Sequence, residues 1–229
     1  FLIKLDENII EKEIFLKIEW SNWYDRNKNH LNTGALENDK IIQYFKKNID
    51  KNNTTLEIWC ANWWRINALK NEVWWSYYWI EPWKKAIEEW KNLFPNIDLY
   101  QWTADMLPYE NDYFDNVIIW FCLYVCDRDD LFKIAYEVDR VLKNWWNIII
   151  LDFEPGYIYK NDYTHLEWIK TYKMDYSKLF LWNPNYFLSN KEVYSHKPDA
   201  DFNDPNERIS LNVLRKNLNF AYPNCKFYE

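Results

Sequence analysis

Short apolar segments alternate with amphipathic segments through the middle of the chain. Strand-like runs occur at residues 55–58, 76–80, 97–101, 114–119 and 147–153. Apolar residues at helical spacing lie between these runs, at residues 65–71, 84–93 and 130–142. Strands that alternate with helices in this way predict βαβ units, and therefore a parallel sheet that is covered by helices on both faces.

The flanking regions add helices before this core and strands after it. Helical spacing at residues 7–17 and 39–47 predicts two amphipathic helices. An aromatic and polar stretch at 157–185 is followed by two strand-like segments, 186–196 and 208–215. We expect these last two segments to pair with each other and to close the sheet with an antiparallel edge.

Tight loops between such elements need glycine, and the chain has almost none. Its 229 residues include 2 glycines and 16 tryptophans, whereas an average chain of this length has roughly 16 glycines. Tryptophan occupies turns that call for a residue without a Cβ atom. Trp59 and Trp63 follow the first predicted strand, and Trp145 and Trp146 separate a predicted helix from the next strand.

We therefore hypothesise that UGA codons that encode glycine have been translated here as tryptophan. The alternative is a protein that is truly rich in tryptophan. Glycine is expected at Trp59, Trp63, Trp79, Trp102, Trp120, Trp145 and Trp146. Contexts that do not require glycine surround Trp23, Trp64 and Trp182, which are expected to be true tryptophans.

Charge and hydropathy limit the partners that the chain can have. A net charge of -7 argues against a nucleic-acid surface, which normally has a basic face, and favours a small-molecule partner. The chain has no run of 18 apolar residues and no signal-peptide pattern, so we expect a cytoplasmic protein that does not enter the membrane. The chain opens at Phe1, as a fragment would. The sequence leaves the oligomeric state open.

Cysteine and histidine spacing indicates neither a metal site nor a disulfide framework. None of the four cysteines forms a C-x-x-C pair, and the three histidines do not cluster with them. The cysteines are Cys60, Cys122, Cys126 and Cys225. Reduced thiols buried in a core are the expected state.

The loop after the first predicted strand carries the main functional motif. With glycine at positions 59 and 63, residues 56–63 become L-E-I-G-C-A-N-G. This resembles the E-x-G-x-G-x-G signature of class I S-adenosylmethionine-dependent methyltransferases, with Ala61 in place of the middle glycine. Enzymes that bind dinucleotides use a related G-x-G-x-x-G turn. Glu57, two residues before the loop, favours the methyltransferase interpretation.

Four further segments resemble the same family in the same order. W-I-E-P at 79–82 ends the second strand with an acid, and W-T-A-D-M-L-P-Y at 102–109 resembles a G-x-A-x-x-L-P-F segment. F-D-N-V-I-I at 114–119 resembles an F-D-x-V strand, and V-L-K-N-W-W at 141–146 resembles an L-K-P-G-G turn. Segments outside this core resemble a bacterial subgroup of the family. They lie at 22–27, 172–177 and 213–216.

The resemblance to methyltransferases of type 11/25 implies a fold, a cofactor and an activity. The fold is a Rossmann-like, mostly parallel seven-stranded sheet with helices on both faces and an antiparallel terminal strand. The implied organisation is an N-terminal helical segment over 1–50 and a core that binds S-adenosylmethionine over 51–153. A lid-like insertion and terminal strands over 154–229 complete the same domain. The implied activity is methyl transfer to a small molecule whose identity the sequence leaves open.

The same resemblance implies which residues bind the cofactor. Glu81 is expected to bind the ribose hydroxyls and Asp105 the adenine amino group, with Met106 beside the adenine ring. The full set comprises Glu57, Trp59, Cys60, Ala61, Trp63, Glu81, Pro82, Asp105, Met106 and Phe121. Two alternatives stay open: an NAD-dependent oxidoreductase on a similar sheet, and a protein without catalytic activity that binds a cofactor or has a blocked site.

A general base is needed only if the methyl acceptor is a hydroxyl or a protonated amine. Candidates by residue type and position are His165, Tyr124, Asp127 and Asp175, although a structural role is the more common one for each. His196 lies in a predicted edge strand, where a structural role is expected. The aromatic stretch at 157–186 could form a lid over an organic acceptor or could simply pack on the surface.

Overall fold

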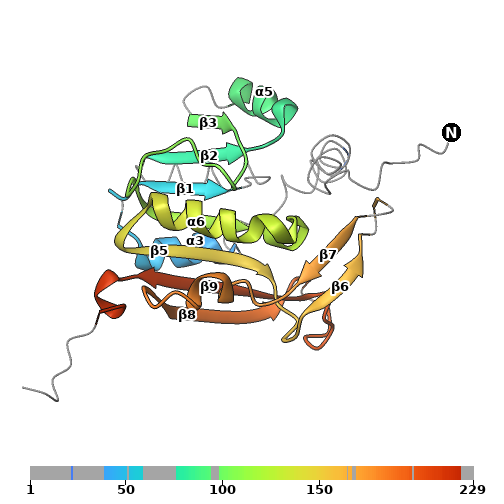
Figure 1. Cartoon of the computed structure of the whole chain (residues 1–229). Helices are drawn as coiled ribbons and strands as arrows, with labels where there is room; N and C mark the ends of the chain where they lie inside the picture. The colour runs from blue at the N-terminus through green and yellow to red at the C-terminus, as the bar shows by residue number, and fades with distance from the viewer. Residues whose placement is uncertain are drawn as a thin grey trace, which may run out of the picture.

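The computed structural model describes residues 22, 39–50, 52–58, 76–93, 98–163, 165–166, 169–197 and 199–222. Seven strands form one sheet in the order β3-β2-β1-β4-β5-β9-β8 (Figure 1). Five of them are parallel: β1 (Thr55–Ile58), β2 (Tyr77–Glu81), β3 (Asp98–Gln101), β4 (Phe114–Trp120) and β5 (Leu142–Phe153). The last strand, β9 (Arg208–Lys216), runs antiparallel between β5 and β8 (Tyr186–Ser195).

Helices cover both faces of this sheet, so the predicted fold class is confirmed. On one face lie α3 (Lys40–Asn48) and α5 (Lys84–Leu93), and on the other lie α6 (Leu131–Val141) and the short α7 (Lys178–Leu181). The described residues include three 3-10 turns: η3 (Leu123–Val125), η4 (Arg128–Asp130) and η5 (Leu218–Phe220). None of the helices within the described residues is long and apolar enough to cross a membrane.

Alternating side chains of the central strands build the two halves of the core. Ile118 and Ile149 pack with α3 and α5, whereas Val117 and Ile148 pack with α6 and α7. Adjacent residues of a strand point to opposite faces, so a strand that is apolar throughout is buried on both sides. Asp39 fixes the start of α3, because its Oδ1 accepts hydrogen bonds from the backbone N–H groups of Ile41 and Ile42 at 2.9 and 3.0 Å.

The stretch after β5 contains a small second sheet that the sequence pattern does not predict. Strands β6 (Tyr159–Asp162) and β7 (Lys170–Lys173) pair antiparallel as a hairpin. Figure 1 shows this hairpin on the side of the molecule where the parallel strands β1, β2 and β5 end. The helices predicted at 7–17 and 65–71 lie outside the described residues.

The sequence pattern predicts a turn at 145–146 and a strand that starts at residue 147. In the structure β5 already starts at Leu142, and residues 145–146 lie in a bulge within it. Leu142 pairs with Phe114 and Asn147 with Asn116, so the register shifts between the two pairs. Trp145, within the bulge, has a backbone φ of 73°. That left-handed conformation is unfavourable for a residue with a Cβ atom and is readily adopted by glycine.

This conformation predicts that Trp145→Gly stabilises the protein. Glycine removes left-handed strain of about 1–2 kcal/mol but adds freedom to the unfolded chain, so the expected gain is about 0.5–1 kcal/mol. Trp182→Gly is the matched control and should destabilise, because Trp182 has an ordinary φ of -70° where glycine relieves no strain. Chemical denaturation of both variants measures the difference. A loss of stability for Trp145→Gly equal to that for Trp182→Gly would contradict the argument.

Candidate active site

The carboxyl ends of β1, β2 and β4 lie side by side at one edge of the sheet. Ile58, the last residue of β1, pairs with Ile80 on one side and with Ile119 on the other. Glu81 therefore lies one residue beyond the end of β1, and Phe121 lies two residues beyond it. From β1 the sheet extends to β2 and β3 on one side and to β4 and β5 on the other. Ligands of open parallel sheets bind outside the carboxyl ends of the strands at such a switch point.

Two buried glutamates mark this edge. Glu57 accepts a hydrogen bond at its Oε2 from the Tyr77 hydroxyl at 3.0 Å. Glu81 accepts one at its Oε1 from the backbone N–H of Trp83 at 3.2 Å, which fixes the orientation of its carboxylate, and Pro82 follows it half-buried. The carboxylate at the end of β2 has the chemistry to accept two hydroxyl hydrogen bonds from a sugar.

The loop after β3 is held in place by α6. Arg140 donates to the backbone oxygens of Leu107 at 3.0 Å and Tyr109 at 2.7 Å, and the N–H of Leu107 donates to Glu137 at 2.7 Å. The hydrogen bond from Arg140, together with that from Leu107, holds the pKa of Glu137 below its usual value. Asp105 is half-buried in this loop. The side chain of the next residue, Met106, is exposed.

Aromatic side chains gather where β4, β5 and β8 end. Phe121 has a φ of 42° directly after β4, and its ring lies 5.3 Å from that of Phe153 and 5.2 Å from that of His196. Tyr124 in η3 packs edge-on against Phe153 at 5.0 Å. We refer to Phe121, Tyr124, Phe153 and His196 as the aromatic cluster. The described part of the chain thus offers a partly exposed aromatic surface beside the end of β1.

Two basic side chains at this site have an unusual pKa: Lys173 beside the aromatic cluster and His196 within it. The Lys173 ammonium lies 3.9 Å from the centre of the Phe153 ring, and burial lowers the Lys173 pKa to about 8. Burial also lowers the pKa of His196, and this effect outweighs the nearby charge of Glu207. His196 is the first residue after β8, which ends at Ser195 and not at residue 196 as the sequence pattern predicts.

Asp152 ties the ends of β4 and β5 together beneath the aromatic cluster. Its side chain is buried and accepts hydrogen bonds from the backbone N–H of Leu123 at 3.0 Å and from that of Phe153 at 2.7 Å. Burial raises the Asp152 pKa to about 7, although these hydrogen bonds and the charge of Arg128 act in the opposite direction. Asp152 therefore positions η3, which carries Tyr124.

The four predicted base candidates lie in different environments. Tyr124 belongs to the aromatic cluster, and Asp127 is half-buried just before η4. His165 is exposed in the turn between β6 and β7, where it contacts Tyr163 edge-on at 5.4 Å.

Asp175 lies in a salt bridge, with Lys191 at 3.1 Å. Burial alone would raise the Asp175 pKa, but hydrogen bonds from Ser177 and Lys191 hold it below its usual value. Such a carboxylate is a weak base. Among the expected cofactor residues, Trp59, Cys60, Ala61 and Trp63 lie outside the described residues.

A comparison with protein families identifies the segment that contains these strands. Residues 56–145 match the family model described as a methyltransferase domain. This segment is therefore a methyltransferase domain. The carboxylates of Glu81 and Asp105 have the chemistry to accept hydrogen bonds from the hydroxyl and amino groups of S-adenosylmethionine, the cofactor that the sequence resemblance implies.

Solved structures resemble the chain along most of its length. An S-adenosylmethionine-dependent methyltransferase from Methanosarcina mazei has a TM-score of 0.61 at 13% identity, and the match covers 78% of this chain and 98% of that one. The 1,6-didemethyltoxoflavin-N1-methyltransferase of Burkholderia thailandensis, solved with bound 1,6-didemethyltoxoflavin and S-adenosylhomocysteine, has a TM-score of 0.68 at 11% identity, with 90% and 89% covered.

A third structure is the complex between the Haloferax volcanii Trm112 methyltransferase activator and a methyltransferase, with a TM-score of 0.66 at 12% identity and 87% and 96% covered. At these identities the likeness establishes the fold. No curated protein sequence matches the chain.

The position of Glu81 predicts that it contributes to cofactor affinity. In the protein with glycine restored at positions 59 and 63, Glu81→Ala should remove a charged hydrogen-bond partner and weaken S-adenosylmethionine binding by about 1.5–3 kcal/mol, or roughly 10- to 150-fold. Calorimetric titration measures this change. Glu88→Ala on the exposed side of α5 is the control and should bind like the wild type. Glu81→Gln keeps the shape of the side chain if the alanine variant unfolds. Unchanged affinity in a folded Glu81 variant would exclude this role.

The raised pKa of Asp152 predicts a pH-dependent stability. Between the unfolded pKa of about 3.9 and the folded pKa of about 7, only the folded protein holds this proton. The contribution of Asp152 to stability is therefore complete below pH ~4 and is lost as the pH rises through ~7. Urea unfolding at pH 5 and pH 8 should show this loss in the wild type relative to Asp152→Asn. An equal wild-type-to-variant difference at both pH values would contradict the assignment.

Proposed function

We propose that the protein transfers a methyl group from S-adenosylmethionine to a small organic molecule that binds against the aromatic cluster. The observation that carries this proposal is the position of Phe121, which belongs to the cluster and directly follows β4, next to the end of β1. An acceptor stacked on these rings would therefore lie beside the cofactor edge. The bound 1,6-didemethyltoxoflavin of the Burkholderia thailandensis enzyme supports a small acceptor.

The cofactor supplies an activated methyl group on a sulfonium, so the chain mainly has to bind and orient the two reactants. In this proposal Glu81 and Asp105 bind the cofactor, and the rings of Phe121 and Phe153 orient the acceptor. His196 accepts a proton when the acceptor is a hydroxyl or a protonated amine. Its lowered pKa supports this role, because the imidazole is then neutral near pH 7 and can act as a base.

The hairpin of β6 and β7 completes the proposed acceptor site. Lys173 at the end of β7 contacts Phe153, which brings the hairpin to the aromatic cluster. This contact supports the interpretation of the region after β5 as a lid-like insertion between the core at 51–153 and the terminal strands. We also infer a cytoplasmic, bacterial protein, on the sequence features given above.

The strand order argues against an NAD-dependent oxidoreductase. The common dinucleotide-binding sheet has the order 3-2-1-4-5-6 with all strands parallel. Here the position beside β5 is taken by the antiparallel β9. An inactive protein remains the alternative if tryptophan is real at positions 59 and 63, since indole rings would occupy space that the cofactor needs.

We infer that several tryptophans stand where the working protein has glycine, because of UGA codons read as tryptophan. Two features support this inference. Trp145 has a left-handed backbone conformation. The indole N–H of Trp79 is fully buried in β2 without a hydrogen-bond partner among the described residues, which is unfavourable for a polar group. Trp182, expected to be a true tryptophan, is largely exposed.

Two versions of the protein test the function and the tryptophans together. One carries tryptophan at all sixteen positions, and the other carries glycine at 59, 63, 79, 102, 120, 145 and 146. The glycine version should bind S-adenosylmethionine but not NAD, and should form S-adenosylhomocysteine with members of a panel of small aromatic hydroxyl and amine acceptors. Tight NAD binding without S-adenosylmethionine binding would overturn the function. Equal cofactor affinity of both versions would overturn the glycine inference, as would mass spectrometry of the native protein that finds tryptophan at these seven positions.

A further inference from the structure

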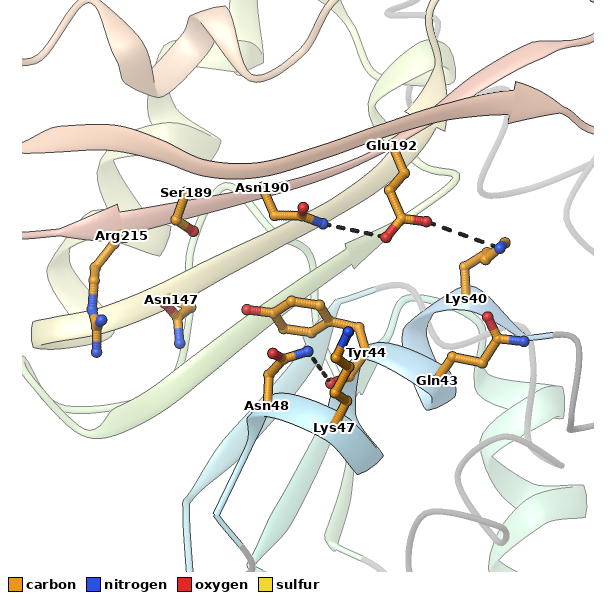
Figure 2. A pocket seen from close by; sticks show the side chains of 10 residues that line it. All are labelled: Lys40, Gln43, Tyr44, Lys47, Asn48, Asn147, Ser189, Asn190, Glu192 and Arg215. Atoms are coloured by element: carbon orange, nitrogen blue, oxygen red, sulfur yellow. Dashed lines mark hydrogen bonds and ion pairs between the residues drawn. The ribbon is translucent and has the colours of Figure 1, made fainter.

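A polar cavity lies between α3 and the strands β5, β8 and β9, apart from the carboxyl edge of the sheet. Its volume is about 520 Å³, within the range of small-ligand sites. Figure 2 shows side chains from α3 facing side chains from the strands across this space. Asn147 lines the cavity and pairs with Asn116 near the start of β4. The cavity therefore reaches the amino ends of the parallel strands, whereas Glu81 and Phe121 lie at their carboxyl ends.

The charges that line the cavity are mostly positive. Lys40, Lys47 and Arg215 contribute three cations, and Glu192 contributes the one carboxylate in the described lining. Lys40 and Glu192 lie 3.9 Å apart and neutralise each other. Two cations remain, Lys47 and Arg215, and neither has an acidic partner among the described residues. The cavity therefore has a local charge of +2, although the net charge of the whole chain is -7.

Arg215 is held in an orientation that leaves its outer nitrogens available. Its Nε donates to the backbone oxygen of Trp145 at 3.0 Å, whereas its two Nη groups make no hydrogen bond within the described part of the chain. The fork of an arginine suits the oxygens of a phosphate or a carboxylate. Tyr44 projects into the same space (Figure 2). Burial raises the pKa of its hydroxyl, and the charge of Arg215 partly offsets that effect.

Amide side chains supply the remaining polar groups. Asn147 is buried and donates through its Nδ2 to Asn116 at 3.2 Å, so its Oδ1 can accept a further hydrogen bond. Asn48 likewise uses its Nδ2 on the Tyr44 backbone oxygen at 2.9 Å. Acceptors of this kind suit hydroxyl groups on a ligand, whereas Arg215 and Lys47 suit a doubly charged anion. A phosphate monoester carries -1.5 to -2 near pH 7, which matches the two free cations.

We propose that this cavity binds a small, hydroxyl-bearing phosphate monoester, with the phosphate on Arg215 beside the Tyr44 hydroxyl and with Lys47 contributing positive charge from the α3 side of the cavity. This site is separate from the proposed methyl-transfer site and does not depend on it. The limited volume favours a metabolite over a polymer.

Calorimetric titration with ribose 5-phosphate, without S-adenosylmethionine, tests the proposal. One saturable site is expected at roughly millimolar affinity or tighter, with ribose and succinate binding at least tenfold more weakly because each lacks one of the two recognised groups. Lys47→Gln and Arg215→Gln should each weaken binding by about tenfold or more. Arg215→Lys, which keeps the charge and loses the fork, should fall between Arg215→Gln and the wild type.

Lys91→Gln is the matched control, because Lys91 is an exposed lysine of α5 that does not line the cavity. It removes the same charge and should leave ribose 5-phosphate binding unchanged. Lys47 makes no hydrogen bond or ion pair with any residue that the structure describes, so its replacement keeps the test valid if an Arg215 variant loses stability. The proposal is overturned by absence of binding in the wild type, by succinate binding more tightly than ribose 5-phosphate, or by an equal effect of Lys47→Gln and Lys91→Gln.

Discussion

The pairing of β1 with β2 on one side and β4 on the other determines where the chemistry of this protein can occur. Strand β1 is four residues long and is buried throughout, with parallel neighbours on both sides. Parallel strands bring their carboxyl ends to one edge, so Glu81 and Phe121 lie at the same edge, on either side of β1, although forty residues separate them in the sequence. The backbone pairing of these strands therefore determines where the site lies.

Buried polar contacts then fix both ends of β5. Lys216 of β9 is buried and donates to the backbone oxygens of Asp139 and Leu142 at 2.8 and 2.9 Å. A cation at the carboxyl end of α6 is stabilised by the helix dipole, and here it also joins that helix to the antiparallel strand. Asp152 performs the equivalent task at the other end of β5, where its buried carboxylate holds η3.

Periodicity predicted the regular core because its strands are buried on both faces and its helices on one. The helix predicted at 84–93 matches α5 (Lys84–Leu93), and the strand at 55–58 matches β1. The hairpin of β6 and β7 was missed because its four-residue strands carry mostly polar side chains, so no apolar alternation marks them. The bulge in β5 was predicted as a turn, since backbone pairing across a register shift leaves no signal in the sequence.

The residues of the candidate site were likewise predictable only in part. Glu81 could be located from sequence, because the end of a parallel strand is a predictable position. His196 and Lys173 could not, since only tertiary packing brings the ends of β7 and β8 against Phe153. The cavity beside α3 is also invisible to periodicity, because Arg215 and Lys47 belong to elements that meet only in the folded sheet.

The two sites lie at different points along β5 and face different electrostatic conditions. Asn147 lines the polar cavity and Phe153 belongs to the aromatic cluster, a separation of roughly 20 Å at about 3.3 Å per residue. Charges at that distance are largely screened, because the Debye length is about 8 Å at physiological ionic strength. The +2 charge of the cavity therefore acts on its own ligand and leaves the aromatic cluster largely unaffected. In an acidic chain, anion binding must rely on such a local concentration of cations, whereas a cationic cofactor at the Glu81 edge is favoured by the overall charge.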